Sequence, residues 1–191
     1  MKSKVVLSLA LVILSSCAVF VIACNNDGLQ HKGDELSARV EIYETTTGFY
    51  DYIITNRHGE IIYSNTAFRL IPSYRCVSPT VIEVNIGIGT STWQSIYYNT
   101  ETDFLSKWYE NRATSNGCLV VTISEISSGE LAIIVQGIFS ENVIASFVRD
   151  FSPIANYGGI ITSAEFLCEN TLNITYFSGS TFDLITEILR F

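Results

Sequence analysis

Apolar and polar residues alternate along much of the chain after residue 38, with the period of two that is typical of a half-buried β-strand. The clearest case is residues 80–89. On one side of this run stand Ile82, Val84, Ile86 and Ile88, and on the other stand Glu83, Asn85, Gly87 and Gly89. We therefore expect the isoleucine and valine side to be buried and the Glu83 side to face solvent.

Turn signals divide the same region into successive hairpins rich in β-branched and aromatic residues. The paired runs are 50–56 with 60–64, 93–98 with 104–109, 118–124 with 131–139, and 172–177 with 182–191. Further extended runs cover 66–71, 145–151 and 160–167, while 140–146 also fits a short helix and 182–191 fits a helix as well as a strand. The pattern predicts an all-β fold of about twelve strands in antiparallel sheets, either a sandwich or an incomplete propeller-like stack.

A faint internal repeat accompanies these strands. Gly59-Glu60 recurs as Gly129-Glu130, and Ser78-Pro79 recurs as Ser152-Pro153. Ile96-Tyr97-Tyr98 likewise recurs as Ile174-Thr175-Tyr176, and Phe104 as Phe182. Spacings of this kind are typical of stacked sheet units. The alternatives are an internal duplication and chance matches among common dipeptides.

The first residues have a different character. Lys2 and Lys4 precede an apolar run from Val5 to Ala23, and Cys24 is followed by polar residues. This order is that of a secretory signal. The residues Val21-Ile22-Ala23-Cys24 resemble the lipobox of bacterial lipoproteins, which implies cleavage before Cys24, acylation of its sulfur by chains such as palmitate, and a membrane-anchored mature protein. Two or more acyl chains make such an attachment durable.

Two other interpretations of this segment remain open. Leu14-Ser15-Ser16-Cys17 also fits the lipobox, but lipidation of Cys17 would leave an apolar stub on the mature chain. Alternatively, the run is a plain signal peptide or an uncleaved anchor. All three place the rest of the chain outside the cytoplasm. We expect a signal peptide over 1–23, a flexible tether over 24–38 and a single all-β domain over 39–191.

Charge narrows the range of partners. Removal of residues 1–23 takes away two of the 11 basic residues and none of the 19 acidic ones, so the mature charge is −10. An acidic surface repels phosphates, which argues against nucleic acid as a partner. We expect contact with a membrane through the N-terminal lipid, and an unknown envelope protein or saccharide as the partner of the domain.

The cysteines allow one disulfide in the mature domain. Once Cys24 is acylated, the free candidates are Cys76, Cys118 and Cys168. Cys118 opens an apolar strand and is expected to be buried. Cys76 and Cys168 are expected in loops and are therefore the predicted pair, although the connectivity stays open. The two histidines of the mature chain, His31 and His58, lack nearby ligand residues, so we expect neither a metal site nor a cofactor.

Catalytic motifs are weak. His58 falls in a predicted turn, and no Gly-x-Ser-x-Gly motif occurs. Gly87-Ile88-Gly89 continues a strand, so the glycines there indicate a bulge or a close backbone approach and not a phosphate loop. The acids available for a paired-carboxylate hydrolase are Glu83, Glu101, Asp103, Glu110 and Glu165. Nothing in the sequence pairs them, and we expect no enzymatic activity.

Aromatic residues supply the remaining hypothesis. Trp93 and Tyr97 share one face of their strand, and Trp108 and Tyr109 lie across the hairpin. If exposed, these rings would form a binding platform, and if buried they would fill the core. The sequence therefore predicts a lipid-anchored envelope protein with a non-catalytic binding domain. A carboxylate hydrolase and a structural subunit of an envelope complex are the alternatives.

Overall fold

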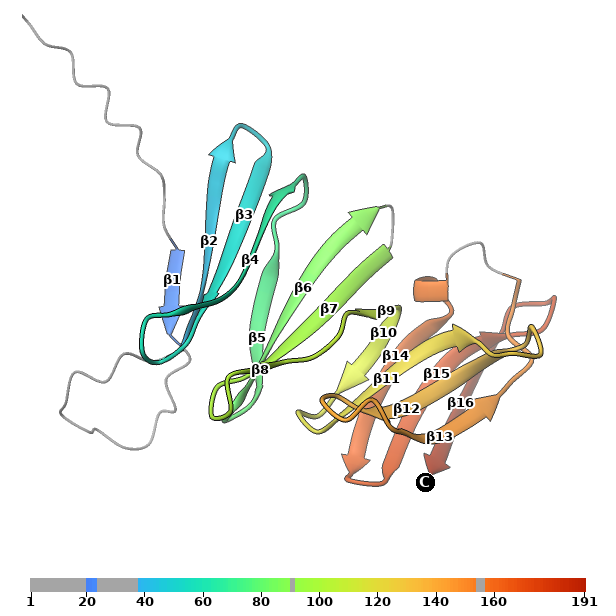
Figure 1. The fold of residues 1–191 in the computed structure, drawn as a ribbon. Coiled ribbons are helices and arrows are strands. Elements are labelled where there is room, and N and C mark those ends of the chain that lie inside the picture. Colours follow the sequence, from blue (N-terminus) through green and yellow to red (C-terminus); the bar gives the residue numbers. More distant parts are fainter. Residues whose placement is uncertain (1–19, 24–37, 90–91, 154–156) are drawn as a thin grey trace, which may run out of the picture.

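The computed structural model describes residues 20–23, 38–89, 92–153 and 157–191. In this part of the chain, sixteen strands form four antiparallel sheets, which confirms the all-β prediction (Figure 1). Sheet A contains β1 (Phe20–Ala23), β2 (Arg39–Thr46), β3 (Phe49–Thr55) and β4 (Ile61–Phe68). Sheet B contains β5 (Ser73–Ser78), β6 (Val81–Gly89), β7 (Thr92–Asn99) and β8 (Phe104–Leu105), with β9 (Tyr109–Glu110) also paired to β7.

The second half of the chain forms the other two sheets. Sheet C contains β10 (Arg112–Ser115), β11 (Leu119–Glu125), β12 (Leu131–Gly137) and β13 (Val143–Val148). Sheet D contains β14 (Ile161–Cys168), β15 (Thr171–Ser178) and β16 (Asp183–Arg190). A short 3-10 helix, η1 (Tyr157–Gly159), precedes β14.

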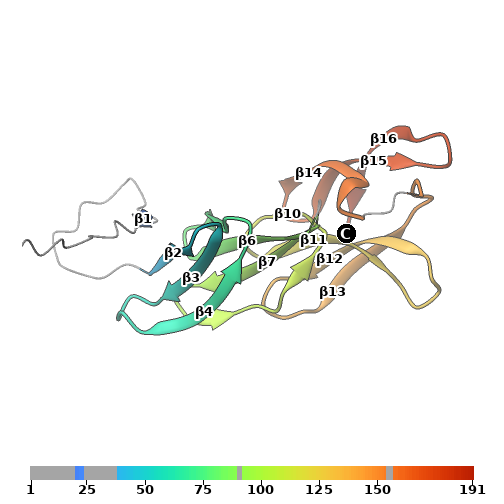
Figure 2. The same ribbon diagram turned by 90° about the horizontal axis from the view of Figure 1, so that it is seen from above.

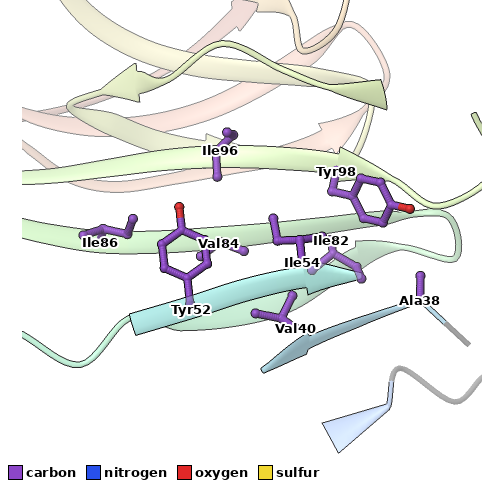
Figure 3. Close-up of a cluster of buried hydrophobic side chains, with 9 residues drawn as sticks. All are labelled: Ala38, Val40, Tyr52, Ile54, Ile82, Val84, Ile86, Ile96 and Tyr98. Atoms are coloured by element: carbon purple, nitrogen blue, oxygen red, sulfur yellow. The ribbon is translucent and has the colours of Figure 1, made fainter. Parts of the chain in front are cut away.

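The sheets stack face to face in chain order. Sheets A, B and C follow one another in Figure 1, and Figure 2 separates sheet D from sheet C. A separate apolar core fills each junction between neighbouring sheets. The junction of sheets A and B holds the core drawn in Figure 3: Ala38, Val40, Tyr52, Ile54, Ile82, Val84, Ile86, Ile96 and Tyr98. The predicted stack of antiparallel sheets is therefore observed, in a sandwich-like form.

The stack explains which strands are buried on both faces. The alternating side chains of β6 point into two different junctions: Ile82, Val84 and Ile86 toward sheet A, and Val81 and Glu83 toward sheet C. Sheets B and C are inner layers of the stack, whereas sheets A and D each have one uncovered face. The expectation that the Glu83 side of β6 faces solvent was wrong, because sheet C covers it. Ile88, expected to be buried, is instead exposed at the strand end.

Three of the predicted hairpins are confirmed: β3 with β4, β11 with β12, and β15 with β16. The segment 182–191 is a strand rather than a helix, because β15 supplies a full ladder of backbone partners for it. The alternative of a short helix at 140–146 was wrong, since β13 pairs with β12 from Val143 onward. The hairpin expected at 93–98 and 104–109 is shorter, because only Phe104 and Leu105 pair directly across from β7 before the chain returns to it as β9.

The predicted repeat has one clear structural counterpart. In both matched turns a glycine lies at φ 81°, namely Gly59 and Gly129. Gly59 N–H donates to the carbonyl of Asn56 at 3.0 Å, and Gly129 N–H donates to that of Ile126 at 2.8 Å. The Ser-Pro matches differ, because Ser78 ends β5, which pairs with β6 of sheet B, whereas Ser152 follows β13, which pairs with β12 of sheet C. The duplication stays a prediction.

Most of the predicted signal peptide and nearly all of the predicted tether lie outside the described residues, and so do Cys17, Cys24 and His31. Of residues 1–38, the structure describes only 20–23 and 38. The last four residues of the predicted signal peptide, Phe20–Ala23, form β1 and pair with β2 from Arg39 to Ile42. Among the described residues, none belongs to a helix long and apolar enough to cross a membrane.

Candidate functional site

The predicted aromatic platform does not form, because its members point in different directions. Tyr97 and Tyr109 lie in the core between sheets B and C, with ring centroids 5.8 Å apart and their rings edge to face. The hydroxyl of Tyr109 donates to the carbonyl of Ile138 at 2.6 Å, and burial raises the pKa of Tyr109 to about 12. These two rings are structural, as their burial requires.

The two tryptophans are separated from that pair. Trp108 packs edge-on against Tyr63 of sheet A, with centroids 6.3 Å apart, beside the core between sheets A and B. Trp93 remains 49% exposed near the start of β7. Of the four predicted platform residues, therefore, Trp93 alone is available at the surface.

A charged cluster at the junction of sheets B and C consists of Arg75, Glu83, Arg112 and Ser115 and is called the Glu83 cluster. The side chain of Glu83 is fully buried. One of its carboxylate oxygens lies 2.8 Å from Arg75 Nε and the other lies 2.6 Å from Arg112 Nε. Arg75 stands opposite Glu83 in the sheet B ladder, whereas Arg112 and Ser115 come from β10 of sheet C. The cluster therefore joins two layers by charge.

A polar row extends the Glu83 cluster. Arg112 Nε also lies 3.1 Å from Ser95 Oγ, and Ser95 Oγ donates to Asn85 Oδ1 at 2.6 Å. Burial raises the pKa of Tyr97, and the nearby charge of Glu83 adds to this shift. Tyr97 lies in β7, directly opposite Glu83 in β6. Two guanidinium groups hold the carboxylate of Glu83 in one orientation. This arrangement suits a structural lock between layers better than proton transfer.

The other candidate carboxylates each have separate surroundings. Asp103 accepts hydrogen bonds from the Tyr98 hydroxyl and from Asn56 Nδ2, and the Tyr98 bond is the main cause of its lowered pKa. Glu110 accepts a hydrogen bond from Gln94, and Glu101 and Glu165 are exposed. A general acid in a glycosidase needs a raised pKa, so the environment of Asp103 does not suit that role.

The predicted Cys76–Cys168 disulfide was wrong. Cys76 lies in β5 of sheet B and Cys168 ends β14 of sheet D, so sheet C stands between them. Cys76 is disulfide-bonded, but Cys168 and Cys118 are free. Cys118 is exposed rather than buried, because the chain turns at Gly117, with φ 90°, immediately before it enters β11.

A surface groove lies where the end of β4 and the link to β5 cross the end of β6. Its volume is about 590 Å³, and it is lined by Ala67, Phe68, Arg69, Leu70, Gly87, Ile88 and Gly89. A Cβ at Gly87 would lie 2.4 Å from Leu70 Cδ1. The predicted close backbone approach at this glycine is therefore confirmed, and the ladder also shifts register between Gly87 and Gly89.

The groove presents apolar surface and one cation. Leu70 and Ile88 are both about half exposed, and Trp93 stands directly across from Gly87 on the same face of the sheet. Arg69 lies over the ring of Phe49, 5.8 Å from its centroid, and no described carboxylate forms an ion pair with it. Ala67 has φ 66° and donates its N–H to Asp51 at 2.9 Å. Left-handed backbone at a non-glycine residue costs about 1 kcal/mol, and such strain clusters at functional sites.

The groove and the role of Glu83 were not predicted from the sequence. Two features of the sequence could have indicated them. Leu70-Ile71 is an apolar pair in a linker, next to Pro72, where polar residues are the rule. Val81, next to Ile82, makes the start of β6 apolar on both faces, which is typical of an inner strand. In the part of the chain that the structure describes, no three histidine, cysteine or carboxylate side chains gather as metal ligands.

Comparison of the chain with protein-family models, with curated proteins and with solved structures finds no match. The function proposed below therefore depends on the residues and the fold alone.

Proposed function

We propose that this chain is a bacterial cell-envelope lipoprotein, anchored by acyl chains on Cys24, whose non-catalytic β-domain binds an apolar segment of an envelope protein in the groove beside Trp93. The observation that carries the binding proposal is the groove itself. Apolar side chains line it without being covered, and its volume of about 590 Å³ is in the range that binding pockets occupy.

Charge and aromatic content favour one of the two expected ligand classes. A saccharide is usually recognised by stacking on several exposed rings, but Tyr97 and Tyr109 are buried and Trp108 packs against Tyr63. The groove instead offers Leu70, Ile88 and the guanidinium of Arg69, which forms no ion pair with a carboxylate of the described residues. These groups fit an apolar protein segment that carries a carboxylate. The hydrolase and the structural subunit remain predictions.

The anchor is tested by labelling. Bacterial cells that produce the full chain would be fed a clickable fatty acid, with Cys24→Ala and Cys17→Ala as variants. We expect the label in wild type and in Cys17→Ala, and its loss in Cys24→Ala. Equal labelling of wild type and Cys24→Ala would refute anchoring at this residue.

The groove is tested by crosslinking in the same cells. A photoreactive amino acid at Ile88 should yield a specific adduct with an envelope protein, and Leu70→Glu should abolish that adduct by placing a charge in the groove. The matched control is the same photoreactive residue at Ile61, which is exposed on β4 outside the groove. Identical adducts from both positions, or none from Ile88, would contradict the proposal.

A further inference from the structure

The outer edge of β2 is covered by a segment that the proposed processing would remove. β1 ends at Ala23, and the expected cleavage precedes Cys24. Within sheet A, β1 is the terminal strand and β2 is its neighbour. Four residues of β2 pair with β1, in the antiparallel register Phe20 with Ile42 to Ala23 with Arg39. Loss of residues 1–23 therefore leaves β2 as the edge strand of sheet A.

The part of β2 that β1 covers, from Arg39 to Ile42, carries two charges but no lysine, proline or bulge. Natural sheet edges are shielded by charged side chains, especially lysine, and by proline, bulges or very short strands. β2 has eight residues without a lysine or proline, and its ladder with β3 is regular from Arg39 to Glu44. Val40 is fully buried and Ile42 packs against the same core, so one face of the strand is anchored to the core between sheets A and B. A regular, open edge of this kind readily accepts another strand.

We propose that β2 of the processed protein pairs with β2 of a second copy, about a twofold axis at Val40. The proposal rests on the proposed function, because the edge opens only when residues 1–23 are removed. Twofold pairing at Val40 sets Val40 opposite its own copy, and sets Arg39 of each chain opposite Glu41 of the other. Both side chains lie on the face of β2 that points away from the core, where they already form an ion pair at 2.7 Å.

Charge selects this register. Antiparallel pairing centred one residue later, at Glu41, would place two carboxylates directly opposite each other, which is unfavourable. Pairing centred at Val40 replaces that repulsion with two Arg39–Glu41 contacts between chains. The same twofold axis places Arg39, the first residue of the domain, close to Arg39 of the second copy. Both expected tethers therefore begin at the same place, and both lipids reach the same membrane. Tethering raises the effective concentration of the copies, which offsets the small size of the contact.

The test uses two differently tagged copies of the full chain, with Cys17→Ala, Cys24→Ala and a site-specific protease sequence in place of residues 26–30. The copies are mixed in detergent before and after cleavage, and capture of one by the other is measured. We expect capture after cleavage and little before it. Arg39→Glu and Glu41→Arg should each lower self-capture about fivefold or more, because two attractive contacts become repulsive.

The decisive arm mixes the two charge variants. Arg39→Glu should capture Glu41→Arg as well as wild type captures itself, because every cross-chain contact is then again between opposite charges. A folding defect would not produce this rescue, and circular dichroism verifies the fold of each variant. Absence of wild-type capture after cleavage, or absence of rescue, would overturn the proposal. Intact mass of the unmodified chain from cells separately reports on processing, so failure of the lipoprotein proposal would be recognised independently.

Discussion

Replacement of Glu83 is the sharpest test of the layered fold. Alternation along β6 predicts that Glu83→Lys is mild, because it places Glu83 on a solvent-facing side. The structure predicts the opposite. Lysine would set a third cation between Arg75 and Arg112 in a site where the Glu83 side chain is fully buried. We expect Glu83→Lys to be about as damaging as Ile86→Asp, which buries a charge in the core between sheets A and B.

The neutral variant Glu83→Gln allows a magnitude to be worked out. Removal of one partner from a buried ion pair costs about 3–5 kcal/mol. Arg112 keeps 21% side-chain exposure and its contact with Ser95, so the lower end applies, at about 3 kcal/mol. With a urea m-value of about 2 kcal/mol/M, the unfolding midpoint should fall by roughly 1.5 M. Urea unfolding followed by far-ultraviolet circular dichroism measures this shift.

Two matched variants complete the experiment. Arg75→Ala removes an arginine whose side chain is 52% exposed and should cost no more than about 1 kcal/mol. The double variant Glu83→Met/Arg112→Met replaces both buried charges with apolar side chains and should recover most of the loss. If Glu83→Gln shifts the midpoint no more than Arg75→Ala, Glu83 does not lock sheets B and C together and the reasoning fails.

Three further predictions follow from single contacts. Tyr109→Phe removes the hydroxyl that donates to Ile138 and should lower stability by about 1 kcal/mol in the same urea assay, and an unchanged midpoint would contradict the hydrogen bond. Both free thiols should react with Ellman's reagent in the native protein, with Cys168 faster than Cys118, because hydrogen bonding to Thr171 lowers its pKa and increases its thiolate fraction at a given pH. The pKa of Asp103 is lowered, so its contribution to stability is present above its ordinary pKa of about 3.9 and is lost as pH falls through the folded value. Asp103→Asn should therefore reduce the loss of stability that occurs as the pH falls below about 4. An unchanged dependence of stability on pH in this range would contradict a contribution from the Asp103 carboxylate.

The hairpins of this protein could be predicted from its sequence because they depend on near neighbours. At residues 56–60, Asn56 and Gly59 form the turn through hydrogen bonds within that segment, and Gly59 takes the left-handed backbone that glycine tolerates. The alternation of Ile82, Val84 and Ile86 likewise identified a buried face correctly. Local chemistry was sufficient for these features.

The candidate sites depended on contacts between distant segments. Leu70 packs on Gly87 only because the β4–β5 link crosses the end of β6. The predicted pairing of Cys76 with Cys168 failed because two strands that seemed to end in loops belong to sheets separated by a third. Sequence spacing carries no information on which sheet a strand joins.

Glu83 shows most clearly which features depend on local sequence and which depend on tertiary structure. A period of two determines that Glu83 and Ile82 point to opposite faces of one strand, because successive side chains of any strand do so. It does not determine whether water or another sheet covers each face. Only the stacking of sheet C on sheet B, with Arg112 opposite the carboxylate, decided that an apparently solvent-facing acid is a buried ion pair between layers.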